Sequence, residues 1–257
     1  PVLVLAGAGS GKTRVITVRI AHLLARRVPP KAVLAVTFTN KAAAEMRERV
    51  AGLVGAKRAG ELTIGTFHAF CLALLREHAK ALGYPKGFAI CDASDQVAAL
   101  KGALRELRIP EATIQPRALQ MQISLAKSRM LTPELFLAQA GGGRDELIGR
   151  AWRRYEERLA RSRSMDFDDL LLRAVQLLEQ REEIRAGLAE RYRYVMVDEY
   201  QDTNAPQYEL VRKIAGGHRN LCVVGDDDQS IYGWRGAEVS HILRFKHDWP
   251  DARVVRL

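Results

Sequence analysis

The sequence is poor in cysteine, with only Cys71, Cys91 and Cys222 and no CxxC pair or Cys/His cluster at metal-ligand spacing. This excludes a disulfide framework and a cysteine-based metal site, and it favours a reducing compartment such as the cytoplasm. No apolar run approaches the roughly 20 residues of a transmembrane helix. Residues 1–5 lack the basic flank and the length of a signal peptide. We therefore expect a cytoplasmic protein that does not interact with a membrane.

Acidic residues are fewer than basic ones, 30 against 40, which gives a formal net charge of +10. This balance favours a polyanionic partner over an acidic substrate, although a merely basic soluble protein remains the alternative that charge alone leaves open. Apolar residues make up 47% of the 257 residues, enough to bury a large core. Collagen, coiled coil and wholesale disorder are excluded.

Short apolar runs recur along the chain, and most are followed by a turn and a helical pattern. Because these runs have no polar face, they predict a parallel sheet covered by helices on both sides, and hence an α/β fold. The predicted strands are residues 2–6, 33–38, 62–67, 194–197 and 221–225, and the predicted helices among them are 14–24, 41–54 and 70–82.

The regular spacing is interrupted once, by about 125 residues between Phe67 and Tyr194, where a crossover between parallel strands takes about 30. We therefore expect a second, inserted domain, with helices over residues 94–107 (N-cap Ser94), 117–130 and 146–163. Residues 101–165 contain 13 lysines and arginines against 7 acidic residues. This makes the insert basic, and a solvated helical face is the alternative to a nucleic-acid surface.

A glycine-rich segment follows the first predicted strand directly and precedes a predicted helix. In such a loop the backbone N–H groups converge on a phosphate, helped by the positive end of the helix. Lys12 would neutralise the β and γ oxygens of a nucleotide, and the Thr13 hydroxyl would bind Mg²⁺. The segment departs from the usual pattern only at its first position, where alanine replaces glycine. Its residues are Ala6, Gly7, Ala8, Gly9, Ser10, Gly11, Lys12 and Thr13.

Two carboxylates follow the predicted strand 194–197, at the carboxyl end where open α/β sheets bind ligands. Asp198 is suited to hold Mg²⁺, and Glu199 is suited to orient and deprotonate an attacking water. A kinase would not need the second carboxylate, because its nucleophile comes from another substrate. An Asp-Glu pair alone could equally be a solvated strand end; the phosphate loop upstream favours a nucleotide hydrolase.

Five further segments of the chain, together with the phosphate loop, form a series of motifs in a fixed order. Together they resemble the UvrD/PcrA/Rep group of superfamily 1 DNA helicases. The resemblance implies a RecA-like P-loop NTPase motor domain with an inserted, mostly helical subdomain. It also implies an ATP-dependent, Mg²⁺-dependent helicase and translocase with 3′ to 5′ polarity. The segments are residues 37–46, 65–71, 166–170, 200–204 and 225–237.

The resemblance also implies roles for single residues. Gln229 would contact the γ-phosphate, Arg14 would lie near the base or sugar, and Gln201 and Asp202 would extend the polar network behind the water. Aromatic rings stack on bases regardless of sequence, and the stacking residues would be Phe38, Phe67 and Trp234. The single-strand groove would further be lined by Thr39, Asn40, His68, Tyr232 and Arg235.

Several of these residues have ordinary alternatives. Phe67 and Phe70 could be core residues, with core the favoured reading for Phe70. His68 could be a plain surface histidine, and metal binding is disfavoured because it has no cysteine or histidine partners at ligand spacing. Trp152 and Trp249 have no motif around them and are expected to be packing residues.

The chain starts on Pro1 and enters a strand at once, so we expect a piece of a longer protein. The resemblance implies two parts outside it: an adenine-recognition segment and a second RecA-like lobe that supplies arginines to the γ-phosphate. Without that lobe we expect slow turnover. The expected division is a motor domain at residues 1–83 and 167–257, with an insert at 84–166.

The expected partners are single-stranded DNA, junctions of single- and double-stranded DNA, and the second lobe. Two alternatives concern the parent protein: the motor subunit of a recombination nuclease complex, or a translocase that clears proteins from DNA. A third applies to the isolated chain, which could be a nucleotide-gated DNA-binding module with negligible turnover.

Overall fold

A computed structural model describes residues 1–7, 11–85, 87–226 and 240–257. The chain divides into two compact units, the first formed by Pro1–Cys71 with Val175–Leu257 and the second by Leu72–Ala174. The boundaries expected from sequence, 84 and 166, both fall inside the second unit. The chain passes between the units within two helices, α4 (Phe67–His78) and α9 (Phe167–Gln180).

The first unit is built on a six-stranded sheet in the order β3-β2-β6-β7-β1-β8, with every neighbouring pair parallel. The run pattern predicted this arrangement, and it is confirmed. The bounds of β6 and β7 are those predicted. The strands are β1 (Val2–Leu5), β2 (Val33–Thr37), β3 (Thr63–Thr66), β6 (Tyr194–Val197), β7 (Leu221–Gly225) and β8 (Arg253–Arg256).

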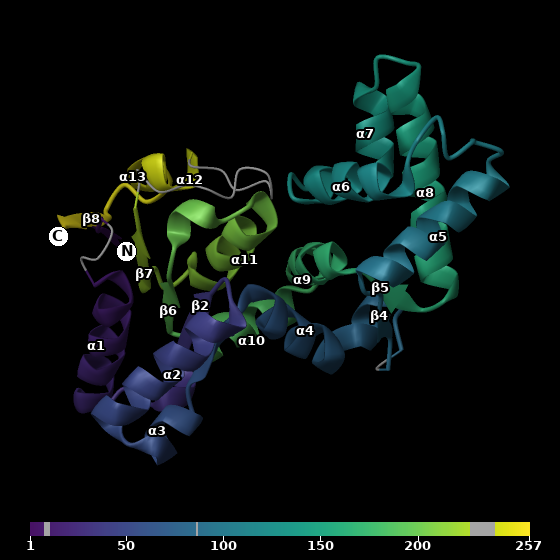
Figure 1. Ribbon diagram of the computed structural model, residues 1–257. Helices are drawn as coiled ribbons and strands as arrows, with labels where there is room; N and C mark the ends of the chain where they lie inside the picture. Colours follow the sequence, from purple (N-terminus) through teal and green to yellow (C-terminus); the bar gives the residue numbers. More distant parts are fainter. Residues whose placement is uncertain (8–10, 86, 227–239) are drawn as a thin grey trace. The chain divides into compact units, whose positions relative to one another are not determined.

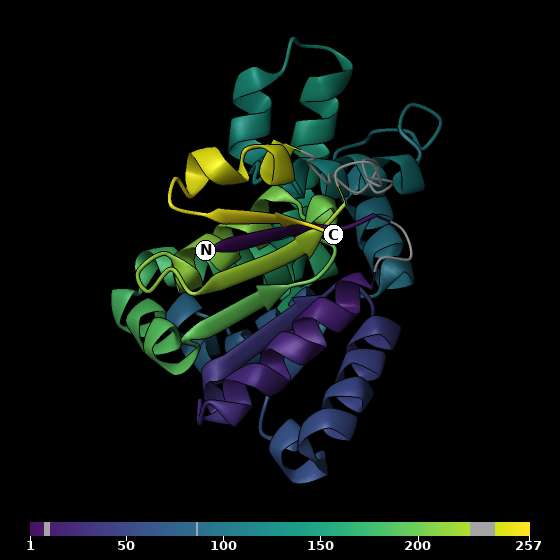
Figure 2. The same ribbon diagram turned by 90° about the vertical axis from the view of Figure 1, so that its left-hand side faces the viewer.

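Helices cover both faces of this sheet (Figures 1 and 2). On one face α1 (Lys12–Ala25) and α2 (Asn40–Val54) bury Ile16, Ile20 and Met46 against alternate strand residues such as Ala35 and Val224. The other face carries α11 (Ala205–Ala215), α12 (Ser240–Leu243) and α13 (Phe245–Asp248). The unit also contains α3 (Ala56–Gly60), α10 (Glu182–Arg191) and 3-10 turns at Pro30–Ala32 and Tyr200–Asp202. Because all neighbouring strands are parallel, their carboxyl ends lie at one edge of the sheet.

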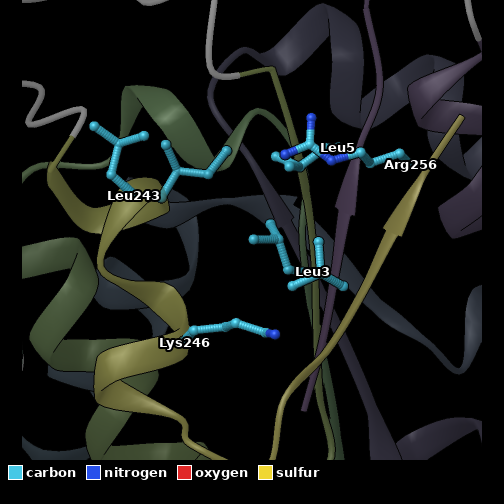
Figure 3. Close-up of a pocket in the computed structure, with 7 residues that line it drawn as sticks. Leu3, Leu5, Leu243, Lys246 and Arg256 are labelled. Carbon is cyan, nitrogen blue, oxygen red and sulfur yellow. The ribbon is translucent and has the colours of Figure 1, made fainter.

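A pocket of about 420 Å³ lies where α12 and α13 face the β1–β8 edge. Figure 3 shows Leu3 and Leu5 of β1 on one side and Leu243 and Lys246 of the two helices on the other. Among the described residues, none of those expected to bind nucleotide or DNA lines this pocket.

The second unit is mainly helical. Its elements are β4 (Ala89–Ile90), α5 (Ala93–Glu106), α6 (Pro116–Lys127), α7 (Pro133–Gln139), α8 (Arg144–Arg161), β5 (Ser164–Met165) and a 3-10 turn at Ala79–Leu82. Its core gathers Trp152 and Tyr155 of α8 with Leu100 and Leu104 of α5, so Trp152 packs as expected.

The predicted N-cap of α5 was wrong. The helix begins at Ala93, and Asp92 is the cap, because its carboxylate accepts hydrogen bonds from the backbone N–H groups of Ser94 and Asp95. Asp95 returns a hydrogen bond to the backbone of Asp92, which completes a capping box. Ser94 lies in the first turn, where its hydroxyl also donates to Asp92 at 2.6 Å.

A buried charge cluster connects α6, α8 and α9 within the second unit. The ammonium of Lys127, whose side chain is 2% exposed, lies 2.8 Å from Asp166, 2.8 Å from Asp169 and 2.7 Å from Glu156. The Tyr155 hydroxyl donates to Asp166 at 2.9 Å. Burial raises the pKa of Asp169 to about 7. For Asp166 the Lys127 charge outweighs the effect of burial and lowers the pKa.

Candidate functional site

The phosphate loop connects the end of β1 to the start of α1. Gly11 is the N-cap of α1 with φ of 89° and ψ of 32°, a left-handed conformation that favours glycine. The backbone N–H of Ala6 donates to the Gly225 carbonyl at 3.0 Å, which ties the start of the loop to β7. Gly7, near the start of the loop, and Arg14, in the first turn of α1, are exposed. Ala8, Gly9 and Ser10 lie outside the described residues.

Lys12 lies between two carboxylates at the carboxyl edge of the sheet. Its ammonium is 3.1 Å from Glu199 and 3.8 Å from Asp226, and its side chain is mostly buried. The sequence patterns predicted no role for Asp226. A signal for it was present, because Asp226 follows β7 directly, and β7 is the strand between β1 and β6.

The two carboxylates after β6 have different surroundings. Asp198 is 2% exposed and accepts a hydrogen bond from the Thr13 hydroxyl at 3.1 Å. Burial, together with the neighbouring Glu199 charge, raises the pKa of Asp198 to about 6. Glu199 is half-buried and has left-handed backbone angles, with φ of 51° and ψ of 47°. This uncommon conformation for a non-glycine residue turns the chain sharply after the strand.

Gln201 connects the carboxylates to the neighbouring strand. Its side-chain amide donates to Glu199 at 2.8 Å, and its carbonyl oxygen accepts from the backbone N–H of Asp226 at 3.0 Å. Asp202, one residue further, is buried. Burial raises the pKa of Asp202 to about 6, and the Glu199 charge adds to the shift.

The donor set fits a magnesium ion in one respect: the hydroxyl of Thr13 and the carboxylate of Asp198 are hard oxygen ligands that face each other. Among the described residues no group of three histidine, cysteine, aspartate or glutamate side chains comes together at metal-binding distances. A cation here would therefore need water and phosphate oxygens to complete its coordination, as is usual for magnesium.

Of the predicted DNA-contacting residues, Phe38, Thr39 and Asn40 lie together at the end of β2 and the start of α2. Phe38 is half-buried, and the other two are exposed. Thr39 is the N-cap of α2 and accepts from the backbone N–H of Ala42 at 3.1 Å. His68 is half-buried in the first turn of α4.

Phe67 lies beneath Phe38. Its side chain is 1% exposed, and its ring meets that of Phe38 edge-on at 5.6 Å between centroids. The stacking role of Phe67 stays a prediction. Phe70 is also buried, edge-on against Tyr192, as expected of a core residue.

Four predicted residues that follow β7 lie outside the described part of the chain. They are Gln229, Tyr232, Trp234 and Arg235.

Comparison with known proteins matches this chain to one family. The family model of the UvrD/REP helicase N-terminal domain matches residues 1–250. The ATP-dependent DNA helicase PcrA of Bacillus subtilis (strain 168) is 44% identical over 258 aligned positions. The same-named protein of Staphylococcus aureus (strain Mu50 / ATCC 700699) is 43% identical over 258 positions. Each comparison covers 100% of this chain and 35% of the relative, so the chain spans about a third of the relatives' length.

Within the described ranges, no helix is both long enough and apolar enough to cross a membrane.

Proposed function

The chain belongs to the UvrD/REP helicase family, and from that premise we propose that it forms the nucleotide-binding part of an ATP-dependent DNA helicase and translocase. One observation carries the proposal. Two strands that are not neighbours in the sheet, β1 and β6, deliver complementary groups to one place, Thr13 facing Asp198 and Lys12 facing Glu199. This is the arrangement that hydrolysis of a magnesium-bound nucleotide requires.

The roles of the residues follow from their contacts. Lys12 exchanges its ion pair with Glu199 for phosphate oxygens of ATP, and this frees a Glu199 oxygen to accept a proton from the attacking water. Gln201 holds the Glu199 carboxylate in place, because its side-chain amide donates a hydrogen bond to that carboxylate. Thr13 and Asp198 would hold Mg²⁺, which when bound neutralises charge on the phosphates. The products are ADP and inorganic phosphate.

We further propose single-stranded DNA and its junctions with duplex as substrate. Phe38, Thr39, Asn40 and His68 lie on or next to the ends of β2, which neighbours β6, and of β3, which neighbours β2. Tyr232, Trp234 and Arg235 carry the chemistry of stacking and phosphate binding. Binding would depend on phosphates and ring faces and show little sequence preference. The basic insert at 84–166 would contribute charge.

The proposal also assigns 3′ to 5′ polarity, a cytoplasmic location and a second RecA-like lobe as partner. These parts rest on family membership and on the composition of the chain.

The test is ATP hydrolysis by the full-length protein with and without oligothymidylate. We expect DNA to stimulate turnover in the parent. Glu199→Gln should keep MgATP binding and lower the turnover number about 100-fold or more, because a general base contributes on that order. Glu190→Gln makes the same chemical change at an exposed position of α10 and should match the parent. Hydrolysis that persists at the parental rate in Glu199→Gln would refute the assignment of the base.

A further inference from the structure

A groove of about 480 Å³ lies between α1 and the end of α2 with α3, within the first unit. Figures 1 and 2 show α1 beside α2, and α3 directly after α2. The part of α1 that lines the groove begins six residues after Lys12 and ends thirteen residues after it, about 9 to 20 Å along the helix. The groove is therefore separate from the candidate nucleotide site. Its lining includes Val18, Ala21 and Ala25 of α1, Leu53 of α2 and Arg58 of α3.

The apolar residues of this groove are exposed together. Val18 is 49% exposed and Leu53 is 56% exposed, one on each of two neighbouring helices. Ala21 and Ala25 lie one turn apart on α1 and have no side-chain atoms beyond Cβ, so another helix can come close to α1 here. Apolar side chains that gather in one exposed groove mark an interaction surface, whereas a single exposed leucine does not.

Basic residues predominate around the groove. Residues 18–27 and 53–61 contain five lysines and arginines against one acidic residue, Glu61. His22 and Arg58 line the groove, and both are exposed. A partner that places apolar side chains in the groove therefore gains from acidic side chains beside them, because the charges are complementary.

We propose that this groove docks a short amphipathic helix of a partner protein, with an apolar stripe flanked by acidic residues. Helices bind such grooves through apolar residues at positions i, i+3, i+4 and i+7. Single-stranded DNA fits the groove less well, because the aliphatic side chains of Val18, Leu53 and Val54 can neither stack on bases nor bind phosphate. The inference goes beyond ATP-driven activity and does not depend on it.

A pair of synthetic peptides tests the proposal on the full-length protein. The probe is a fluorescent peptide of about 18 residues with leucine at positions i, i+3, i+4 and i+7 and glutamate on both flanks of that stripe. The control peptide has lysine in place of every glutamate. We expect the glutamate peptide to bind in an anisotropy titration, and the lysine peptide to bind about tenfold more weakly or not at all.

Two substitutions locate the binding on the groove. Leu53→Asp removes an apolar contact and adds a like charge, so it should weaken binding of the glutamate peptide about tenfold or more. Arg58→Glu should weaken binding of the glutamate peptide and strengthen binding of the lysine peptide. Met121→Asp, at a residue of α6 that is 69% exposed, makes a comparable change in the second unit and should bind like the parent. The thermal midpoint should match the parent in all three variants, since each position is exposed.

Access to the groove in the full-length protein is measured separately. Leu53→Cys should react with a maleimide at position 53, as located by mass spectrometry of the digested protein. A thiol at this position that does not react would show that another part of the same chain covers the groove, and it would overturn the proposal.

Three results of the titrations would also overturn it. They are equal affinities of the two peptides for the parent, an unchanged affinity in Leu53→Asp, and displacement of the glutamate peptide by oligothymidylate. The last result would assign the groove to nucleic acid.

Discussion

At the scale of single residues, Asp202 shows how burial and charge act on one carboxylate. Its Oδ1 is buried and has no hydrogen-bond partner among the described residues, and it faces the field of Glu199. Both effects disfavour the ionised form, and the pKa rises to about 6. Between the ordinary pKa of aspartate, about 4, and this raised value, the folded chain binds more protons than the unfolded chain. Stability therefore falls as pH rises through this window.

Replacing Asp202 by Asn should stabilise the protein at neutral pH. The amide removes the cost of the buried charge, which is fully present above pH 6 and disappears as the parent becomes protonated toward about pH 4. We expect a higher thermal midpoint for Asp202→Asn than for the parent at pH 7.5, and a smaller difference at pH 4.5. Glu190→Gln, at an exposed carboxylate of α10, should show no such pH dependence. A destabilised Asn variant at pH 7.5 would contradict the argument.

At the scale of elements, the start of α5 depends on one side chain. Asp92 accepts two backbone N–H groups that would otherwise have no intrahelical partner. Asp92→Ala should lower the free energy of unfolding by about 1 kcal/mol, measured by urea denaturation. Asp92→Asn, which keeps an accepting oxygen, should lose only a small part of this. Equal losses in Ala and Asn would show that the cap does not stabilise the helix.

Some features of the fold are easier to predict from the sequence than others. The bounds of β6 and β7 were predicted correctly because an apolar run ends where the next residue is charged or polar, as at Asp198 and Asp226. The choice between Asp92 and Ser94 as N-cap depends on backbone angles that composition does not reveal. The two-residue strands β4 and β5 are too short to show any periodicity.

In the candidate site, too, some features could be predicted from the sequence and others could not. The contacts of Lys12 with Glu199 and of Thr13 with Asp198 follow from parallel strands that end at one edge of the sheet. The burial of Phe67 could not be predicted in this way, because a phenylalanine at the start of a helix has the same sequence pattern whether its ring is covered or exposed.

At the scale of the whole molecule, the second unit contains its own electrostatic centre in Lys127. Replacing it by Met would leave Asp166, Asp169 and Glu156 buried together without the ammonium, which costs about 3 to 5 kcal/mol in comparable buried pairs. Because the units are separate in their internal contacts, hydrogen exchange should accelerate in 72–174 and remain parental in 1–71. Lys101→Met, at an exposed pair 4.0 Å from Glu111 in the same unit, should change little. Acceleration spread evenly over the chain would contradict this.

The net charge of the whole chain gives a second prediction at this scale. With +10 overall, affinity for oligothymidylate should fall about tenfold or more between about 50 and 200 mM salt, because bound phosphates release counterions. Fluorescence anisotropy titrations at both salt concentrations measure it. A flat salt response would exclude a substantial contribution of the basic residues to DNA binding.

The chain enters and leaves the second unit on helices rather than on flexible loops, at α4 and α9. An α-helix turns by about 100° and rises by about 1.5 Å per residue, so each residue inserted or deleted within α4 or α9 moves the later positions of that helix onto another face. A unit exchanged between relatives should therefore be cut at matching helical positions. An insertion of seven residues, close to two full turns, should preserve the buried face of the helix better than one of two.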